Sequence, residues 1–126
     1  MNRVVHFEIH VEDVKRAVAF YSGLFGWKFT KWHGPVDYWS IETGTTEPGI
    51  DGGLLPRKSI TDSEAVTAYI CTIEVDNLDK MVARAQASGA SIAVPKMAIP
   101  GIGWLAYLKD TERNTFGIMQ SDPTAK

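Results

Sequence analysis

The chain has 126 residues, of which 44% are apolar and 22% charged. These values are typical of one globular domain with its own core, and they exclude a disordered or fibrous chain. The formal net charge of −2 gives no basic surface for nucleic acid, and no apolar run approaches the roughly 18 residues of a membrane span. The single cysteine, Cys71, suits a reducing compartment. We therefore expect a cytoplasmic protein that binds neither nucleic acid nor membranes.

The first element is predicted to be a strand over residues 4–11, which alternate in polarity and are rich in β-branched side chains. Because side chains alternate with period 2 along a strand, this one has an apolar face and a polar face. The apolar face carries Phe7, Ile9 and Val11, and the polar face carries His6, Glu8 and His10.

A helix is predicted to follow. Asp13 suits its N-cap, because a carboxylate there accepts hydrogen bonds from the free N–H groups of the first turn. Apolar residues recur at helical spacing over 14–25 and form one stripe, and Gly23 and Gly26 offer C-terminal ends. We expect the stripe to pack on the apolar face of the strand, which leaves the polar face on the side away from the helix.

The rest of the first half is predicted to contain strands at 27–32 and 36–43 and a short strand within 50–56. The polar stretch 57–64 has no apolar period and is predicted to be a linker. In the second half the pattern restarts with a strand at 65–75, an N-cap at Asp76 and a helix ending at Gly89. Three further strands are predicted at 91–99, 103–109 and 115–121.

The two halves can be overlaid. Asp76 follows Asp13 by 63 positions, and Gly117 follows Gly53 by 64. A nearly constant offset indicates an internal duplication. We predict a single α+β domain in which two tandem βαβββ repeats, about 3–56 and 65–121, form a half-open mixed sheet or barrel around a cleft. The polar face of the first strand would line that cleft.

The stretch VVHFEIHVEDVKRAVAFYSGLFGWKF resembles the opening of the vicinal oxygen chelate superfamily, which includes glyoxalase I, bleomycin-resistance proteins and extradiol dioxygenases. The stretch LKDTERNTFGIMQ is similar to the closing turn and strand of that superfamily, with Arg113 in place of the usual glycine. The resemblance covers nearly the whole chain and implies the fold predicted above. It does not imply one activity, because the superfamily includes lyases, isomerases, oxygenases and non-catalytic binders.

The resemblance also implies four metal-ligand positions, two in each repeat. They fall at His6, Gly53, Tyr69 and Gly117. Only His6 offers the expected donor, and one histidine does not hold a divalent ion, which needs several converging N or O donors. We therefore expect no metal or other cofactor. A divalent metal bound by an altered set, such as Glu8 with one neighbouring histidine, stays open as the alternative.

Glu8 and His10 are the candidate catalytic residues. A carboxylate beside an imidazole favours the charged imidazolium and would raise the pKa of the histidine, so the pair would suit proton transfer on a bound substrate. The alternative is a hydrogen-bonded polar cluster on a partly solvated strand face. Either arrangement would allow the cluster to bind a ligand.

Tyr69 and Cys71 are predicted to share the cleft-lining face of the second repeat's first strand, with Cys71 favoured as a structural thiol over a nucleophile. Several aromatic residues, Trp27, Trp32, Tyr38, Trp39, Trp104 and Tyr107, are available as core or as cleft walls. The predicted ligand-binding cleft comprises His6, Glu8, His10, Tyr69, Cys71 and Trp104.

The leading functional interpretation is a glyoxalase- or bleomycin-resistance-like protein that binds a small molecule and has largely lost the metal site. The second is a lyase or isomerase of the glyoxalase type, either metal-dependent with altered ligands or metal-free with Glu8 and a histidine as acid and base. The third is a plain dimerising module. Because superfamily members often pair, a homodimer is expected.

Overall fold

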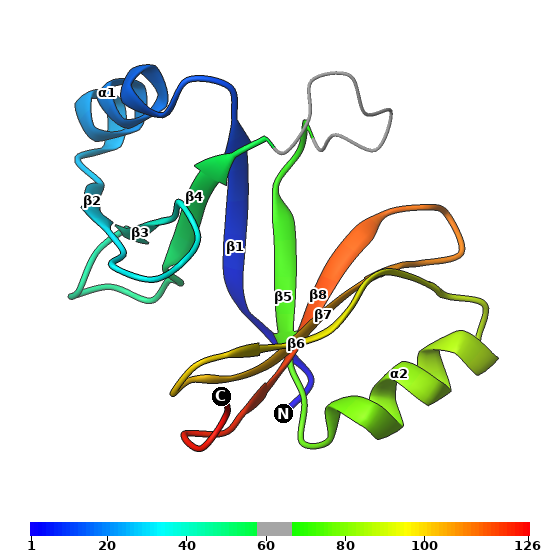
Figure 1. The fold of residues 1–126 in the computed structure, drawn as a ribbon. Coiled ribbons are helices and arrows are strands. Elements are labelled where there is room, and N and C mark those ends of the chain that lie inside the picture. The colour runs from blue at the N-terminus through cyan, green and yellow to red at the C-terminus, as the bar shows by residue number, and fades with distance from the viewer. Residues whose placement is uncertain (58–66) are drawn as a thin grey trace. The chain divides into compact units, whose positions relative to one another are not determined.

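The computed structural model describes residues 1–57 and 67–126. Its elements are β1 (Arg3–Val11), α1 (Val14–Phe25), β2 (Lys28–Lys31), β3 (Trp39–Glu42), β4 (Gly52–Pro56), β5 (Ile70–Glu74), α2 (Leu78–Ala87), β6 (Ser91–Ile99), β7 (Gly103–Lys109) and β8 (Thr115–Ser121) (Figure 1). This order is β-α-β-β-β twice over, so the predicted α+β class and tandem repeat are confirmed. Most of the predicted linker lies outside the described residues.

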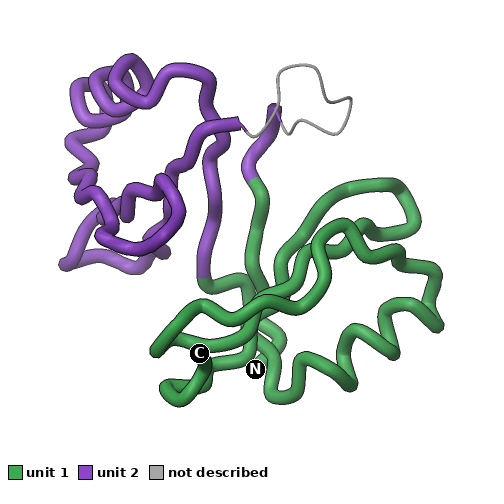
Figure 2. The backbone as a smooth tube through the Cα atoms, in the orientation of Figure 1, with its two compact units in different colours: residues 1–5, 70–126 green, residues 6–69 purple. Residues whose placement is uncertain are grey.

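The chain divides into two compact units (Figure 2). Unit 2 comprises His6–Tyr69, and unit 1 comprises Met1–Val5 together with Ile70–Lys126. The division passes through β1, whose first residues are counted with the second repeat. At this point the Asn2 N–H donates to the Glu74 carbonyl at 2.8 Å. The second repeat therefore includes the N-terminal end of the chain in its unit.

Unit 2 places its strands in the order β2-β3-β4-β1. β1 runs parallel to β4 and pairs Glu8 with Gly53, whereas β2, β3 and β4 are antiparallel neighbours. The apolar face of β1 packs under α1, as predicted. The buried core of this unit consists of Phe7, Ile9, Val11, Ile41 and Leu54, and burial of each large side chain contributes about 1.5–3 kcal/mol.

The ends of α1 are those that the sequence predicts. The Asp13 carboxylate accepts a hydrogen bond from the Arg16 N–H at 3.0 Å, which satisfies one of the free donors of the first turn. At the other end Gly26 takes a left-handed conformation, φ 73°, and its N–H donates to the Ser22 carbonyl. Glycine adopts that conformation without steric cost.

Unit 1 places its strands in the order β5-β8-β7-β6. β5 runs parallel to β8 and pairs Thr72 with Gly117, and the other neighbours are antiparallel. The core lies under α2 and consists of Val75, Leu78, Ala106, Leu108 and Ile118. The arrangement of strands and helix therefore repeats that of unit 2.

The second repeat differs from the prediction by one residue. The N-cap of α2 is Asn77, whose side chain accepts from the Lys80 N–H at 3.0 Å, and Asp76 precedes it. The offset from Asp13 is thus 64 rather than 63, which is also the offset between the paired glycines of β4 and β8.

This shift changes which residue corresponds to His6. With an offset of 64 the counterpart is Ile70, the first residue of β5, and not Tyr69. A shift of one residue along a strand moves a side chain to the opposite face. In the structure the position that corresponds to His6 is therefore Ile70, whereas the sequence predicted Tyr69.

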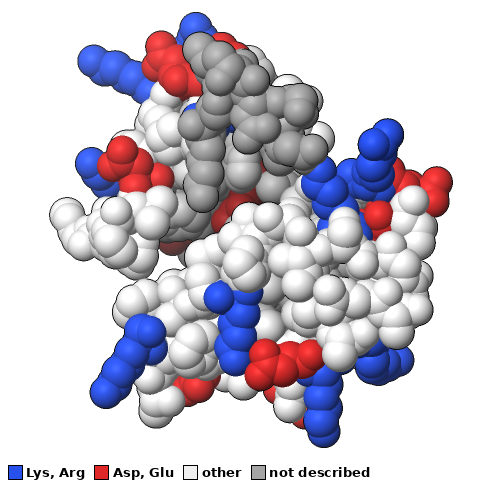
Figure 3. All heavy atoms as spheres, turned by 45° about the vertical axis from the view of Figure 1, so that its right-hand side comes forward, with Lys and Arg blue, Asp and Glu red and all other residues white. Residues whose placement is uncertain are grey.

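Charges of both signs occur together on the surface. On the face drawn in Figure 3, Lys and Arg side chains of the described residues are interspersed with Asp and Glu, which is consistent with a formal net charge of −2. Within the described part of the chain, neither helix has the length and apolar character needed to cross a bilayer.

Candidate functional site

The polar face of β1 brings two of the predicted catalytic residues together. Glu8 is buried, with 7% of its surface exposed, and its Oε1 lies 3.5 Å from Nε2 of the half-buried His10. The separation is at the outer limit of a hydrogen bond. The predicted contact between a carboxylate and an imidazole is therefore present, in a loose form.

Tyr38 joins this face from the segment just before β3. Its hydroxyl lies 3.2 Å from Nε2 of His6 and forms a hydrogen bond with it. The next residue, Trp39, packs against the core under α1, so the alternation of the strand turns Tyr38 to the other side. The sequence left open whether Tyr38 or Trp39 lies on the side of the polar face of β1, and in the structure it is Tyr38.

Tyr38 also explains a glycine in β4. A Cβ built on Gly53 would collide with the Tyr38 hydroxyl and ring, so the phenol occupies the space that a side chain at position 53 would need. Gly53 pairs with Glu8 in the sheet, which places this space on the polar face of β1. The sequence signal for this arrangement is the missing side chain at Gly53, and no local pattern links that glycine to Tyr38.

Burial decides the electrostatics of this cluster. It lowers the pKa of His6 below the ordinary value of 6.5, although the charges of Glu8 and Asp51 act in the opposite direction. Burial also raises the pKa of Tyr38, and the charge of Glu8 adds to that rise. For His6, desolvation outweighs the neighbouring carboxylates, so the pKa increase that the sequence predicted is not found there. At neutral pH the pair is an uncharged imidazole and an uncharged phenol.

The lowered pKa of His6 predicts a stability that depends on pH. A group that takes up its proton less readily when folded contributes stability above its unfolded pKa, and that stability is lost as the pH falls from 6.5 towards the folded value. Glu8→Gln removes a charge that raises this pKa and is expected to lower it further. An NMR titration of the His6 ring protons measures this pKa in the unmodified protein and in Glu8→Gln. An increased pKa in Glu8→Gln would contradict the assignment.

The four metal positions implied by the resemblance are His6, Gly53, Ile70 and Gly117 once the offset of 64 is applied. Only His6 carries a donor atom. The described residues contain no group of three or more His, Cys, Asp or Glu side chains placed to hold an ion. The residues at these positions therefore do not fit the metal that metal-using members of the superfamily bind.

The space around the two glycines supports the same conclusion. In unit 2 the phenol of Tyr38 fills the position beside Gly53. In unit 1 a Cβ on Gly117 would lie 2.9 Å from Oγ1 of Thr72 and 3.1 Å from the Tyr107 ring. A carboxylate side chain at either position would have to displace a neighbour.

The other predicted cleft residues lie on the helix-facing sides of their own units. Tyr69 stacks on Phe7, with ring centroids 5.8 Å apart. Cys71 is exposed and alternates with Thr72, the residue that pairs with Gly117. Trp104 packs against the core under α2, and its Nε1 donates to Asp122 at 3.0 Å. The one-residue shift in the second repeat accounts for the difference between the predicted and the observed faces of Tyr69 and Cys71.

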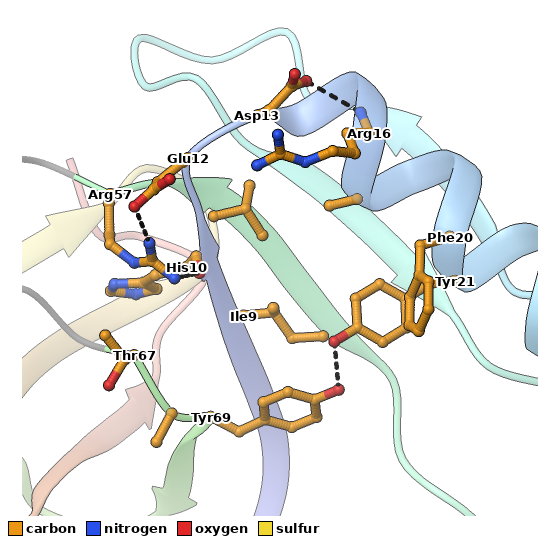
Figure 4. Close-up of a pocket in the computed structure, with 13 residues that line it drawn as sticks. Ile9, His10, Glu12, Asp13, Arg16, Phe20, Tyr21, Arg57, Thr67 and Tyr69 are labelled. Atoms are coloured by element: carbon orange, nitrogen blue, oxygen red, sulfur yellow. Dashed lines mark hydrogen bonds and ion pairs between the residues drawn. The ribbon is translucent and has the colours of Figure 1, made fainter.

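A cavity of about 460 Å³ opens on the helix-facing side of unit 2, where β1 ends and α1 begins (Figure 4). We call it the α1 pocket. Its wall includes His10, Arg16, Phe20, Tyr21, Arg57 and Tyr69. Of the six residues that the sequence assigned to a cleft, this pocket contains His10 and Tyr69.

Tyr69 is bonded to Tyr21 in this wall, its hydroxyl donating at 2.8 Å. Burial and this hydrogen bond raise the pKa of Tyr69 to about 12. The stability that the group contributes is present below pH 10 and is lost as the pH rises through 12. Tyr21→Phe removes the acceptor and is expected to lower the pKa of Tyr69. Ultraviolet titration of tyrosinate measures this change, and Tyr38→Phe should leave the Tyr69 transition in place.

Comparisons with known proteins agree with the resemblance. Residues 3–44 match the family model described as bleomycin resistance protein-like, N-terminal. The chain is 29% identical over 115 residues to a glyoxylase-like domain-containing protein of Didymella fabae, covering 88% of each. A hypothetical protein from Bacillus halodurans C-125 superposes with a TM-score of 0.72 at 16% identity, covering 99% of this chain and 98% of that one. Methylmalonyl-CoA epimerase from Mycobacterium tuberculosis superposes with a TM-score of 0.70 at 12% identity, covering 95% and 88%.

These findings establish the fold. The chain shares its fold with the hypothetical protein and with methylmalonyl-CoA epimerase, which agrees with the fold that the motifs at both ends of the chain implied. Residues 3–44 are similar to the bleomycin resistance protein-like N-terminal family, and the chain is similar over most of its length to a glyoxylase-like protein.

Proposed function

We propose that the protein binds a small organic molecule through hydrogen-bonding side chains on the polar face of β1, without a bound metal ion. The observation that carries this proposal is the position of Tyr38. Its phenol fills the space beside Gly53 and bonds to His6, the one residue that matches a family ligand. The imidazole that would hold an ion is thereby given a hydrogen-bonding partner instead.

The charges near this cluster favour a particular kind of ligand. His6 and Tyr38 are uncharged at neutral pH, and each can both donate and accept a hydrogen bond. Glu8 is buried beside them, and Asp51 adds a second negative charge that acts on His6. A carboxylate or phosphate would be repelled here. The proposed ligand is therefore neutral or cationic and carries hydroxyl, amide or amine groups.

A thermal-shift screen tests this proposal with neutral and cationic heteroaromatic compounds, antibiotics among them, each with and without EDTA. A ligand is expected to raise the melting temperature selectively, and the shift is expected to survive EDTA. Tyr38→Phe should weaken the shift, whereas Tyr21→Phe, the same substitution under α1, should leave it intact. A shift that disappears with EDTA, or near-stoichiometric Zn, Ni, Mn or Fe in protein purified without chelator, would contradict the proposal.

A second function is favoured by the contact between Glu8 and His10. A carboxylate 3.5 Å from an imidazole is suited to moving a proton on a bound substrate, as in a metal-free lyase or isomerase. The fold likeness to methylmalonyl-CoA epimerase supports the same reaction class. Glu8→Gln keeps the shape and removes the base. If a substrate is found and this variant turns it over at the unchanged rate, Glu8 has no role in proton transfer.

The expected compartment and assembly belong to the same proposal. Cys71 is the single cysteine and is exposed as a free thiol, which suits the reducing cytoplasm. A homodimer remains the expected assembly. Light scattering on the purified protein at micromolar concentration tests it, and a monomer there would contradict it.

A further inference from the structure

The α1 pocket has features of a binding site in its own right. It lies at the end of β1, where Ile9, His10 and Val11 contribute to its wall but His6 and Glu8 do not, and every residue that lines it belongs to unit 2. Its volume of about 460 Å³ falls in the range of pockets that bind small molecules. We propose that it binds a compact aromatic carboxylate, independently of the polar face of β1.

Two tyrosines form a preorganised wall of this pocket. Tyr69 stacks on Phe7 at 5.8 Å with an interplanar angle of 16°, and Tyr21 stacks on Trp27 at 5.3 Å with an angle of 7°. The hydroxyls of the two tyrosines are joined by the 2.8 Å hydrogen bond. Each tyrosine ring thus packs against a second aromatic ring. A wall that is already ordered loses little conformational entropy when a ligand binds.

Phe20 adds an apolar ring beside this wall. It meets Tyr21 edge to face at a centroid distance of 5.1 Å, yet 58% of its surface is exposed, as is 50% of that of Tyr69. Both rings line the pocket, and in Figure 4 the Tyr21 ring lies between them. An aromatic ligand that covers them would remove apolar surface from water and gain ring contacts.

Among the residues that the structure describes, the ion pairs and hydrogen bonds of the pocket leave the Arg16 guanidinium available. The guanidinium of Arg57 donates to Glu12 at 2.9 Å and to the His10 carbonyl at 3.2 Å. Asp13 caps α1 by accepting from the backbone N–H of Arg16. The guanidinium of Arg16 makes no ion pair with any residue that the structure describes.

Arg16 and Phe20 are four positions apart in α1, so they occupy the same face of the helix. Figure 4 shows the guanidinium of Arg16 extending from α1 towards the end of β1. Arg16 and Phe20 thus bring a cation and an exposed aromatic ring to the same pocket. Guanidinium pairs well with carboxylate in bidentate geometry, so the matching ligand has an aromatic ring and a carboxylate.

The same charges separate this site from the polar face of β1. On the polar face, Glu8 and Asp51 act on His6 and repel anions. In the α1 pocket, the carboxylates of Glu12 and Asp13 are already hydrogen-bonded, and Arg16 attracts anions. An aromatic carboxylate is thus directed to the α1 pocket, and a neutral or cationic ligand to the polar face. The two sites are distinguished by the charge of the probe.

Calorimetric and NMR titrations with benzoate, benzamide and benzylamine test the proposal. Benzoate is expected to bind about tenfold more tightly than benzamide, because only benzoate pairs with Arg16. Arg16→Gln should lower benzoate affinity about tenfold and leave benzamide affinity unchanged. The matched control is Lys15→Gln, which removes an adjacent cation that does not line the pocket and should change neither.

Two further variants make the result decisive. Phe20→Ala removes an exposed ring, so folding is retained, and it should weaken benzoate and benzamide alike. Tyr38→Phe, on the polar face, should leave benzoate binding intact, which separates this proposal from the proposed function. Absence of benzoate binding at millimolar concentration, equal affinity for benzoate and benzamide, or an Arg16→Gln variant that binds benzoate normally would each overturn it.

Discussion

Gly53→Ala is expected to lower the free energy of unfolding by about 1–3 kcal/mol, which is the usual cost of overpacking. The added Cβ would enter the space occupied by the Tyr38 phenol, so the ring must move and its hydrogen bond to His6 is strained or lost. In a Tyr38→Ala background that space is empty, and Gly53→Ala should cost little. Urea unfolding of the four proteins measures the coupling, which should be about 1 kcal/mol or more.

The control for this cycle is Gly44→Ala in the same unit. A Cβ at Gly44 would meet nothing within 4 Å, so the free energy of unfolding should change by no more than about 0.5 kcal/mol. If Gly53→Ala and Tyr38→Ala were instead additive, the phenol would not occupy the space beside Gly53. The case against a metal donor at this position would then lose its structural basis.

Leu78→Ala is expected to have the largest effect on unit 1, a loss of about 2–5 kcal/mol in the free energy of unfolding. Leu78 is 0% exposed and belongs to the core under α2. Its backbone N–H donates a hydrogen bond to Oε1 of the Gln120 side chain at 2.9 Å, and this bond is available to alanine as well. The loss would therefore report burial of the leucine side chain, and urea unfolding monitored by circular dichroism measures it.

Leu24→Ala provides the matched comparison, since it is the same substitution in the other helix. Leu24 is 60% exposed on α1, so its replacement should change the free energy of unfolding by about 0.5 kcal/mol or less. Equal losses for the two variants would show that burial is not what distinguishes these leucines, and the core assignment for unit 1 would fail.

Much of the fold could be predicted because its signals are local. The alternation of β1 is readable residue by residue, and Asp13 and Gly26 mark the ends of α1 by their own chemistry. The boundaries predicted for the last three strands coincide with β6, β7 and β8. These segments lie between glycine- or loop-rich stretches, so each is defined without reference to distant parts of the chain.

The second repeat shows where local signals are insufficient. Asp76 and Asn77 are adjacent, and both residue types are favoured N-caps, so the sequence does not choose between them. The structure selects Asn77. Because side chains alternate along a strand, this single position decides whether Tyr69 or Ile70 corresponds to His6. A small ambiguity in a helix cap thus shifted the expected counterpart of His6 by one residue.

The candidate site could be predicted only where local signals define it. Parity within β1 placed His6, Glu8 and His10 on one face and required no tertiary information. Tyr38 reaches His6 from 32 positions away along the chain, a distance that no local pattern specifies. The direction of the His6 pKa was missed because it depends on how deeply the ring is buried, and burial is set by the assembled unit.

The Tyr38–Gly53 arrangement has an evolutionary consequence. A descendant that recovered a carboxylate at position 53 in one step would force the phenol out of a packed site before any ion could compensate. Shortening Tyr38 first would leave His6 without its bonded neighbour and bring no immediate benefit. A carboxylate at position 53 therefore requires two substitutions with a disfavoured intermediate, so the Tyr38 phenol makes such a change less accessible.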